Sequence, residues 1–333
     1  MKKKQLNERQ LGRIQRMQDK HTTHPGTEEA LAGPQRRGLV ITHFGQQLDI
    51  EALDGDDRGG IVRCHQRSNL EPLVAGDEVI WQQGTTSNVV VAALPRRSEL
   101  RRPNLYGELK PVAANIDTLV IVIAPEPEPH YNLIDRYLVA AENNGLHPLL
   151  LLNKSDLLQA ANREPLQHLM ALYHTLGYPA LEVSSRSHSG LPDLLARLSD
   201  HTSIFVGQSG VGKSALVNAL MPGVNTLEGT LSEGVTKGRH TTTSARLFHF
   251  PKGGNLIDSP GIREFGLSHL DVGQLMYGFI EFRPFLDGCR FRDCKHEREP
   301  GCRLLEAATQ GRIDPRRLSS YQLIRSSLES NNA

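Results

Sequence analysis

The chain has 333 residues, a length that predicts about two domains. Its 38% hydrophobic content excludes a chain that is disordered throughout. No apolar run approaches the roughly 20 residues of a membrane helix, and no apolar segment follows the N-terminal lysines, so neither a membrane span nor a secretory signal is expected. We therefore predict a cytoplasmic protein that does not contact membranes.

The net charge of +1 hides a local asymmetry. Residues 1–37 hold nine Lys or Arg against four acidic residues, and we predict that they form a mobile basic tail. Such a tail is either solvated without a role or an electrostatic arm for a polyanion such as RNA.

Five short strands without a helix are predicted in residues 38–97, at 38–44, 47–53, 60–65, 77–81 and 88–93. The spacing favours a small β-barrel, OB-like in the first instance and SH3-like as the alternative. Cys64 is expected to be a small core residue of this barrel. Four arginines between two prolines then indicate a basic linker at a domain boundary: Arg96, Arg97, Arg101 and Arg102, between Pro95 and Pro103.

Residues 98–278 change to buried apolar runs that alternate with helical segments, which predicts a doubly wound α/β domain with a mostly parallel sheet. The predicted strands are 118–124, 149–152, 181–184, 203–206, 245–250 and 255–257. The predicted helices are 133–142, 166–176, 191–198 and 214–220.

Residues 207–214 read GQSGVGKS, the pattern of a P-loop, and lie between a predicted strand and a predicted helix. Backbone N–H groups of such a loop hold phosphates, while Lys213 would reach the β- and γ-phosphates and Ser214 would bind Mg²⁺. The predicted nucleotide contacts are Gly207, Gln208, Ser209, Gly210, Val211, Gly212, Lys213, Ser214 and Ala215.

Residues 153–156 read NKSD after a predicted strand and match N-K-x-D. Asp156 can accept hydrogen bonds from the N1–H and the 2-amino group of guanine, and adenine has neither donor, so the motif predicts guanine specificity. The predicted contacts are Asn153, Lys154, Ser155 and Asp156, together with Ser184 and Ser185, which we expect to pack on the base.

Residues 258–261 read DSPG, where Asp258 would belong to the Mg²⁺ shell and Gly261 would offer its N–H to the γ-phosphate. The preceding stretch 225–243 is rich in Gly, Thr and Ser and is predicted to be a switch segment. Thr241 or Thr242 would bind Mg²⁺ in the triphosphate state only.

The residue after Gly261 is Ile262, which cannot orient an attacking water as Gln does in other GTPases, so slow intrinsic hydrolysis is predicted. His240 is our candidate for that role, beside the catalytic Lys213. The alternatives are that His240 packs within the switch or touches RNA, that a monovalent ion assists near Gly210, or that a ribosomal group orients the water.

The base loop precedes the P-loop by about fifty residues, which is a circular permutation of the usual GTPase order. The permuted order leads from the second switch almost directly into residues 279–333, predicted to be a small helical domain. Its pattern C-x₄-C-x-H-x₅-C suits one structural Zn²⁺, whereas a disulfide is disfavoured by the odd number of clustered cysteines. The predicted ligands are Cys289, Cys294, His296 and Cys302.

With these motifs, the chain from about residue 36 onward resembles the RsgA (YjeQ) family of bacterial ribosome biogenesis GTPases. The resemblance implies a cytoplasmic GTPase that binds the maturing small ribosomal subunit, contacts its rRNA through the barrel and the zinc domain, and leaves after the subunit has stimulated hydrolysis of GTP to GDP. We expect a monomer. Two alternatives remain: a permuted GTPase of large-subunit assembly, for which the zinc-ligand spacing is atypical, and an RNA-binding scaffold that uses GTP only structurally.

Overall fold

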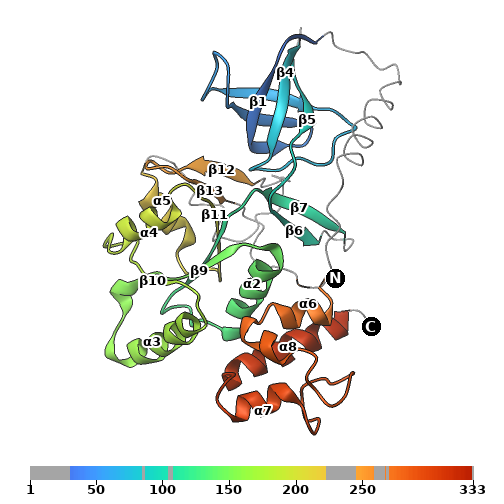
Figure 1. Cartoon of the computed structure of the whole chain (residues 1–333). Coiled ribbons are helices and arrows are strands. Elements are labelled where there is room, and N and C mark those ends of the chain that lie inside the picture. The colour runs from blue at the N-terminus through green and yellow to red at the C-terminus, as the bar shows by residue number, and fades with distance from the viewer. Residues whose placement is uncertain are drawn as a thin grey trace, which may run out of the picture.

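The computed structural model describes residues 31–84, 87–103, 108–222, 245–258, 267 and 270–331. They form a β-barrel, a central α/β domain and a C-terminal helical domain, and the barrel and the helical domain lie at opposite ends of the α/β domain (Figure 1). No helix in this part of the chain has the length and apolar character needed to span a membrane.

The N-terminal barrel has five strands, namely β1 (Leu31–Phe44), β2 (Gln47–Ala52), β3 (Ile61–Gln66), β4 (Glu78–Gly84) and β5 (Asn88–Ala93). They are hydrogen-bonded in the order β1-β2-β3-β5-β4, and β4 closes the barrel on β1. This Greek-key order, with β3 parallel to β5, is that of an OB-fold and excludes the SH3-like alternative. Cys64 is fully buried in the barrel core, as predicted.

Strand β1 begins at Leu31, earlier than the predicted start at residue 38. Residues 35–39 pair with β4, so residues 31–37 belong to the barrel and not to a tail, and residues 1–30 lie outside the described residues. Arg36 pairs with Asp57, and Arg37 lies 2.7 Å from Glu78. Residues 31–37 were not predicted as part of a strand, because Arg36 and Arg37 are charged and the segment shows no alternation of apolar and polar residues.

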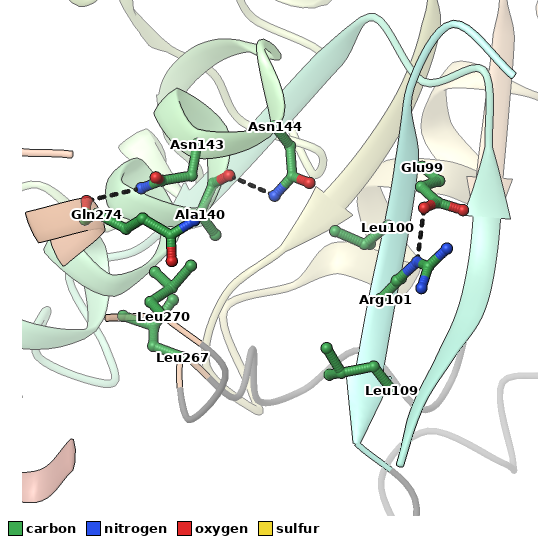
Figure 2. A pocket seen from close by; sticks show the side chains of 10 residues that line it. All are labelled: Glu99, Leu100, Arg101, Leu109, Ala140, Asn143, Asn144, Leu267, Leu270 and Gln274. Atoms are coloured by element: carbon green, nitrogen blue, oxygen red, sulfur yellow. Dashed lines mark hydrogen bonds and ion pairs between the residues drawn. The ribbon is translucent and has the colours of Figure 1, made fainter. Parts of the chain in front are cut away.

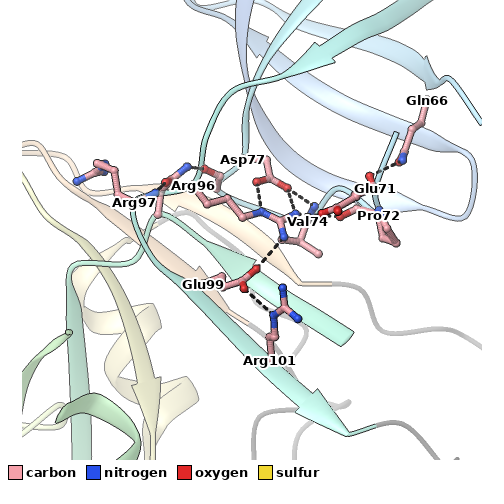
Figure 3. A network of polar contacts seen from close by, with 11 residues as sticks. Gln66, Glu71, Pro72, Val74, Asp77, Arg96, Arg97, Glu99 and Arg101 are labelled. Carbon is pink, nitrogen blue, oxygen red and sulfur yellow. Dashed lines mark hydrogen bonds and ion pairs between the residues drawn. The ribbon is translucent and has the colours of Figure 1, made fainter. Parts of the chain in front are cut away.

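The predicted basic linker is mostly a second, two-stranded sheet, formed by β6 (Glu99–Pro103) and β7 (Leu109–Ala114). Ahead of it, the guanidinium of Arg96 donates to both oxygens of the buried Asp77 at 2.7 Å and to Glu99 at 3.0 Å (Figure 3). Asp77 is a barrel residue and Glu99 begins the next domain. Arg96 therefore fastens the two domains, because removing it would leave a buried carboxylate without its countercharge.

The α/β domain contains β8 (Thr118–Ile123), β9 (His147–Leu152), β10 (Ala180–Glu182), β11 (Thr202–Val206), β12 (Arg246–His249) and β13 (Asn255–Asp258). Its helices are α2 (Tyr131–Asn144), α3 (Ala160–Thr175), α4 (Leu191–Leu198) and α5 (Lys213–Leu220), with the short 3-10 turn η1 (Ser155–Leu157). The strand order is β10-β9-β8-β11-β13-β12, and all are parallel except β12.

Strand β8 shows that helices cover both faces of this sheet. Leu119 and Ile121 pack in one apolar cluster with residues of α2 and α3, whereas Val120 and Val122 pack in another with residues of α4 and α5. Because successive side chains of a strand point to opposite faces, the all-apolar sequence of β8 is the consequence of burial on both sides. The predicted doubly wound domain is confirmed.

The C-terminal domain contains α6 (Val272–Tyr277), η2 (Ile280–Phe285), α7 (Arg303–Thr309) and α8 (Pro315–Asn331). Phe279, Phe282 and Tyr321 form its aromatic centre. Leu275 of α6 belongs to the same apolar cluster, so the packing of this domain extends upstream of the predicted boundary at residue 279.

A pocket lies where the C-terminal domain meets the α/β domain (Figure 2). It is lined by Leu100 and Leu109 from β6 and β7, by Ala140 and Asn144 from α2, and by Leu270 ahead of α6. Leu270 follows the DSPG motif by only nine residues, so the second predicted switch leads directly into this junction.

Candidate functional site

The P-loop connects β11 to α5, as the sequence predicted. A side chain at Gly207 would place its Cβ 2.1 Å from the Val122 carbonyl oxygen, so only glycine fits against strand β8. The Lys213 Nζ lies 2.7 Å from the carbonyl oxygens of both Gly207 and Gln208. The loop therefore holds a positive charge at the N-terminus of α5, which itself favours an anion.

Asn153 of the N-K-x-D loop connects the P-loop to the loop that contains Ser184 and Ser185. Its side chain is fully buried and donates to the Val211 carbonyl at 2.9 Å, while its Oδ1 accepts from the Ser185 N–H at 3.2 Å. A Cβ at Gly212 would come within 2.5 Å of the Asn153 amide nitrogen, so the two loops are in close contact. Asn153 thus holds the P-loop next to the loops that are predicted to read the base.

Asp156 lies in η1 and is exposed, with one carboxylate oxygen accepting from the Ser184 hydroxyl at 2.5 Å. Ser184 is itself fully buried and accepts from the Ser187 N–H at 3.0 Å. Ser184 was predicted to pack on the base, and the structure shows in addition that its hydroxyl holds the carboxylate that is predicted to read guanine. Lys154 has a left-handed backbone, and its Nζ donates to the Glu126 carbonyl at 2.9 Å.

Asp258 ends β13, two strands from β8 at the same edge of the sheet as the P-loop. Burial raises the pKa of its carboxyl group, and the positive charge of Lys213 opposes that shift. A partly buried carboxylate and the Ser214 hydroxyl are hard oxygen donors of the kind that Mg²⁺ prefers. The donor set fits the predicted Mg²⁺ site.

Four predicted site residues lie outside the part of the chain that the structure describes: His240, Thr241, Thr242 and Gly261. Their roles therefore stay predictions. Sequence reasoning in turn missed the Glu126 and Val122 carbonyls, for which no sequence signal exists because they act through backbone atoms.

The four predicted zinc ligands come together in the C-terminal domain, and their ligand atoms all lie within 4.8 Å of one another. Cys289 Sγ and Cys302 Sγ are 4.0 Å apart, and His296 Nδ1 lies 3.3 Å from Cys302 Sγ. Zinc–sulfur bonds of about 2.3 Å in a tetrahedron separate two sulfurs by about 3.8 Å, so the residues fit Zn²⁺. No disulfide joins any of the cysteines among the described residues, Cys64 included.

The cluster needs a cation to hold its ligands as thiolates. Burial and the neighbouring thiols raise the pKa of Cys294 to about 12. A bound Zn²⁺ would supply the charge that these thiolates lack, and four protein ligands leave no open position for catalysis. Helix α8 supports the ligands from outside, since Gln322 donates to the His296 carbonyl at 2.6 Å.

Comparisons with known proteins agree with this geometry. A family model described as RsgA GTPase matches residues 93–268. A small ribosomal subunit biogenesis GTPase RsgA of Azotobacter vinelandii is 56% identical over 338 residues, which cover 98% of each chain. Among solved structures, YjeQ from Thermotoga maritima is 30% identical with a TM-score of 0.73, covering 89% of this chain and 99% of that one.

A second solved structure, YloQ, is described as a circularly permuted GTPase. It is 25% identical with a TM-score of 0.71 and covers 92% of this chain and 99% of its own. The permutation read from the motif order is therefore found in a relative of the same fold. Since identity to the Azotobacter protein extends over nearly the full length, the chain belongs to the RsgA GTPase family and hydrolyses GTP.

Proposed function

We propose that this GTPase binds the small ribosomal subunit and acts in its late maturation, hydrolysing GTP to GDP and phosphate with stimulation by the subunit. The observation that carries the proposal is the 56% identity, over 98% of both chains, to a protein named for small-subunit biogenesis. Because ribosomal subunits mature in the cytoplasm, the proposal includes a cytoplasmic protein. It also includes our expectation of a monomer.

Different residues bind the base, the phosphates and Mg²⁺ of the nucleotide. Asp156 accepts from the guanine base, held in orientation by Ser184, and the P-loop N–H groups with Lys213 bind the phosphates. Ser214 and Asp258 would hold Mg²⁺, with Thr241 or Thr242 added in the triphosphate state. When bound, Mg²⁺ neutralises charge on the phosphate oxygens. The chain itself contributes positioning and charge, which is the main source of catalysis in phosphoryl transfer.

His240 completes the proposed mechanism by orienting the attacking water, together with Gly261 as a γ-phosphate contact. We expect His240→Ala to reduce subunit-stimulated turnover by about a hundredfold, the range for loss of a positioned proton-transfer group. Nucleotide affinity should stay near the parental value, and His168→Ala, at an exposed position of α3, serves as the control histidine outside the switch. Parental turnover of His240→Ala on saturating small subunits would assign the role to a ribosomal group instead.

Two exposed aromatic residues support the proposed rRNA contacts. Phe44 at the end of β1 is 50% exposed and has the Arg63 guanidinium 5.4 Å from its ring centre. Phe291 in the zinc loop is 43% exposed, with Arg290 at 5.5 Å. Aromatic rings beside arginines are the usual platforms for stacked bases, and one lies on each domain that the proposal assigns to RNA.

Phe44→Ala and Phe291→Ala should each weaken binding to the small subunit by roughly tenfold or more, because a stacked base contributes about 1–3 kcal/mol. Intrinsic GTP hydrolysis should be unchanged. Leu323→Ala is the matched control, since Leu323 is 63% exposed on α8 and has no aromatic ring on which a base could stack. If both phenylalanine variants bound subunits like this control, the RNA-facing surfaces would lie elsewhere.

Co-sedimentation with each ribosomal subunit tests the proposal as a whole. The protein should pellet with the small subunit in a non-hydrolysable GTP analogue and much less in GDP, and it should not pellet with the large subunit. Preference for the large subunit would instead favour the alternative role in large-subunit assembly. Nucleotide-independent binding without stimulated hydrolysis would favour an RNA-binding scaffold.

A further inference from the structure

Strand β1 pairs with strands of two domains, the barrel and the α/β domain. Up to Leu39 it pairs with β4 and closes the barrel, and at Thr42 it pairs with β12 of the GTPase domain. One continuous eleven-stranded sheet therefore includes both domains. Figure 1 shows β12 on the side of the α/β domain that faces the barrel. The register along β1 shifts between Val40 and Thr42, at the point where the strand changes partner.

The strand that β1 meets belongs to the nucleotide-sensing part of the chain. Strands β12 and β13 lie in sequence between the two predicted switches, and Asp258 is the last residue of β13. Asp258 pairs with Arg246, and Arg246 pairs with Thr42. The three residues form one row across the sheet, and with strands about 4.8 Å apart the Mg²⁺-shell residue is only about 10 Å from the barrel backbone.

Apolar side chains also connect β1 with β12 and β13. Ile41, at the register shift in β1, is buried in the same apolar cluster as Leu247 of β12 and Ile257 of β13, and not in the barrel core. A bulge commonly redirects one side chain in this way. The barrel therefore has an apolar anchor in the core behind Asp258.

A polar contact fastens the other end of β12. His249 Nε2 lies 2.6 Å from a carboxylate oxygen of Glu51 in barrel strand β2, and its Nδ1 lies 2.7 Å from Asn255 Oδ1 in β13. One histidine thus bridges the barrel to the strand that carries Asp258.

The geometry points to the β12–β13 hairpin as the element that couples nucleotide state to the position and order of the barrel. This inference rests on the proposed function. A change in how Asp258 is held when GTP replaces GDP would shift β13, and β12 would pass the shift to β1 through Thr42 and to β2 through Glu51. Phe44, the proposed RNA contact, is two residues beyond Thr42. Since coupling free energies are reciprocal, RNA bound at the barrel would equally change nucleotide affinity.

Amide hydrogen exchange of the full chain tests this coupling directly, with GDP and with a non-hydrolysable GTP analogue, each with Mg²⁺. We expect exchange rates of residues 40–44 to differ between the two nucleotides by at least about fivefold, the lower end of ordinary allosteric coupling. The double variant Glu51→Gln/His249→Ala should reduce this difference to less than about twofold. Glu78→Gln is the matched control, because Glu78 is another paired carboxylate of the barrel, but its partner is Arg37 of β1, at 2.7 Å, and not a residue of β12.

Equal exchange of residues 40–44 in both nucleotides, while residues 207–214 respond, would overturn the coupling and leave the proposed function intact. A double variant that keeps the full parental difference would also overturn it as assigned to this contact. If the chain bound no guanine nucleotide at all, the proposed function would fail first.

Discussion

The two flanking domains are attached to the GTPase domain in different ways. The barrel joins by strand pairing at Thr42, by the buried Ile41 and by Arg96, next to the strands that lead to the predicted nucleotide contacts. The C-terminal domain joins through Arg317 of α8, whose side chain is fully buried.

Arg317 pairs with Asp135 of α2 and with Glu281 of η2, and it lies over the ring of Phe279 at 4.4 Å. Tyr173 of α3 donates to the same Asp135 at 2.7 Å. A buried charge cluster of this kind has one satisfactory arrangement, because separating its partners leaves charges without compensation. The C-terminal joint is therefore fixed by buried charge pairing, whereas the barrel joint runs through the β12–β13 hairpin, which we propose to couple to nucleotide state.

The largest effect is expected at the C-terminal joint. Arg317→Met should cost about 3–5 kcal/mol of unfolding free energy, because it leaves Asp135 and Glu281 buried without a countercharge. Arg316→Met is the neighbouring control, since Arg316 is half-exposed, pairs with Asp314 at 2.6 Å and should contribute at most about 1 kcal/mol. Denaturant titration measures both. Equal stability of the two variants would show that the cluster does not hold the domains together.

A substitution at the barrel joint should cost somewhat less unfolding free energy than one at the C-terminal joint, and it should also change the response to nucleotide. Ile41→Ala should cost about 2–4 kcal/mol, as for other buried isoleucines, and it should also reduce the nucleotide-dependent difference in barrel exchange. Ile61→Ala, which removes a 59% exposed side chain from the same barrel, should change stability by no more than about 0.5 kcal/mol. If Ile41→Ala lost stability but kept the full nucleotide-dependent difference in barrel exchange, the barrel joint would serve stability alone, like the C-terminal joint.

The smallest effect concerns pH and the zinc loop. Hydrogen bonds from backbone N–H groups, with Lys295 first, lower the pKa of Glu299 to about 2. A depressed carboxyl pKa contributes stability above its ordinary value near 4.5, and the contribution disappears as pH falls from there towards 2. The stability difference between the parent and Glu299→Gln should thus be constant from pH 7 to about 5 and then shrink. Glu297→Gln controls for charge in the same loop, and a difference independent of pH would reject the assignment.

The motifs were predictable from sequence because each consists of neighbouring residues. The P-loop, the N-K-x-D loop and the four zinc ligands all lie where their spacing placed them, and β8 was recognisable from its unbroken apolar run. Contacts between distant residues were not predictable. Arg317 and Asp135 are 182 positions apart, and nothing local marks that arginine as buried.

Charged strands were missed for a related reason. Strand β6 contains Arg101 and Arg102, which resemble a solvated linker when side-chain alternation is the only guide. Its partner β7 supplies the pairing that makes it a strand. The junctions between the domains, where such segments gather, were consequently the least predictable part of the fold.

Steady-state GTP hydrolysis with and without purified ribosomal subunits tests the central claim most directly. The account predicts slow turnover by the protein alone, an increase of more than tenfold with small subunits, and no increase with large subunits at the same concentration. Turnover that is unchanged by small subunits, or that large subunits stimulate equally, would contradict it.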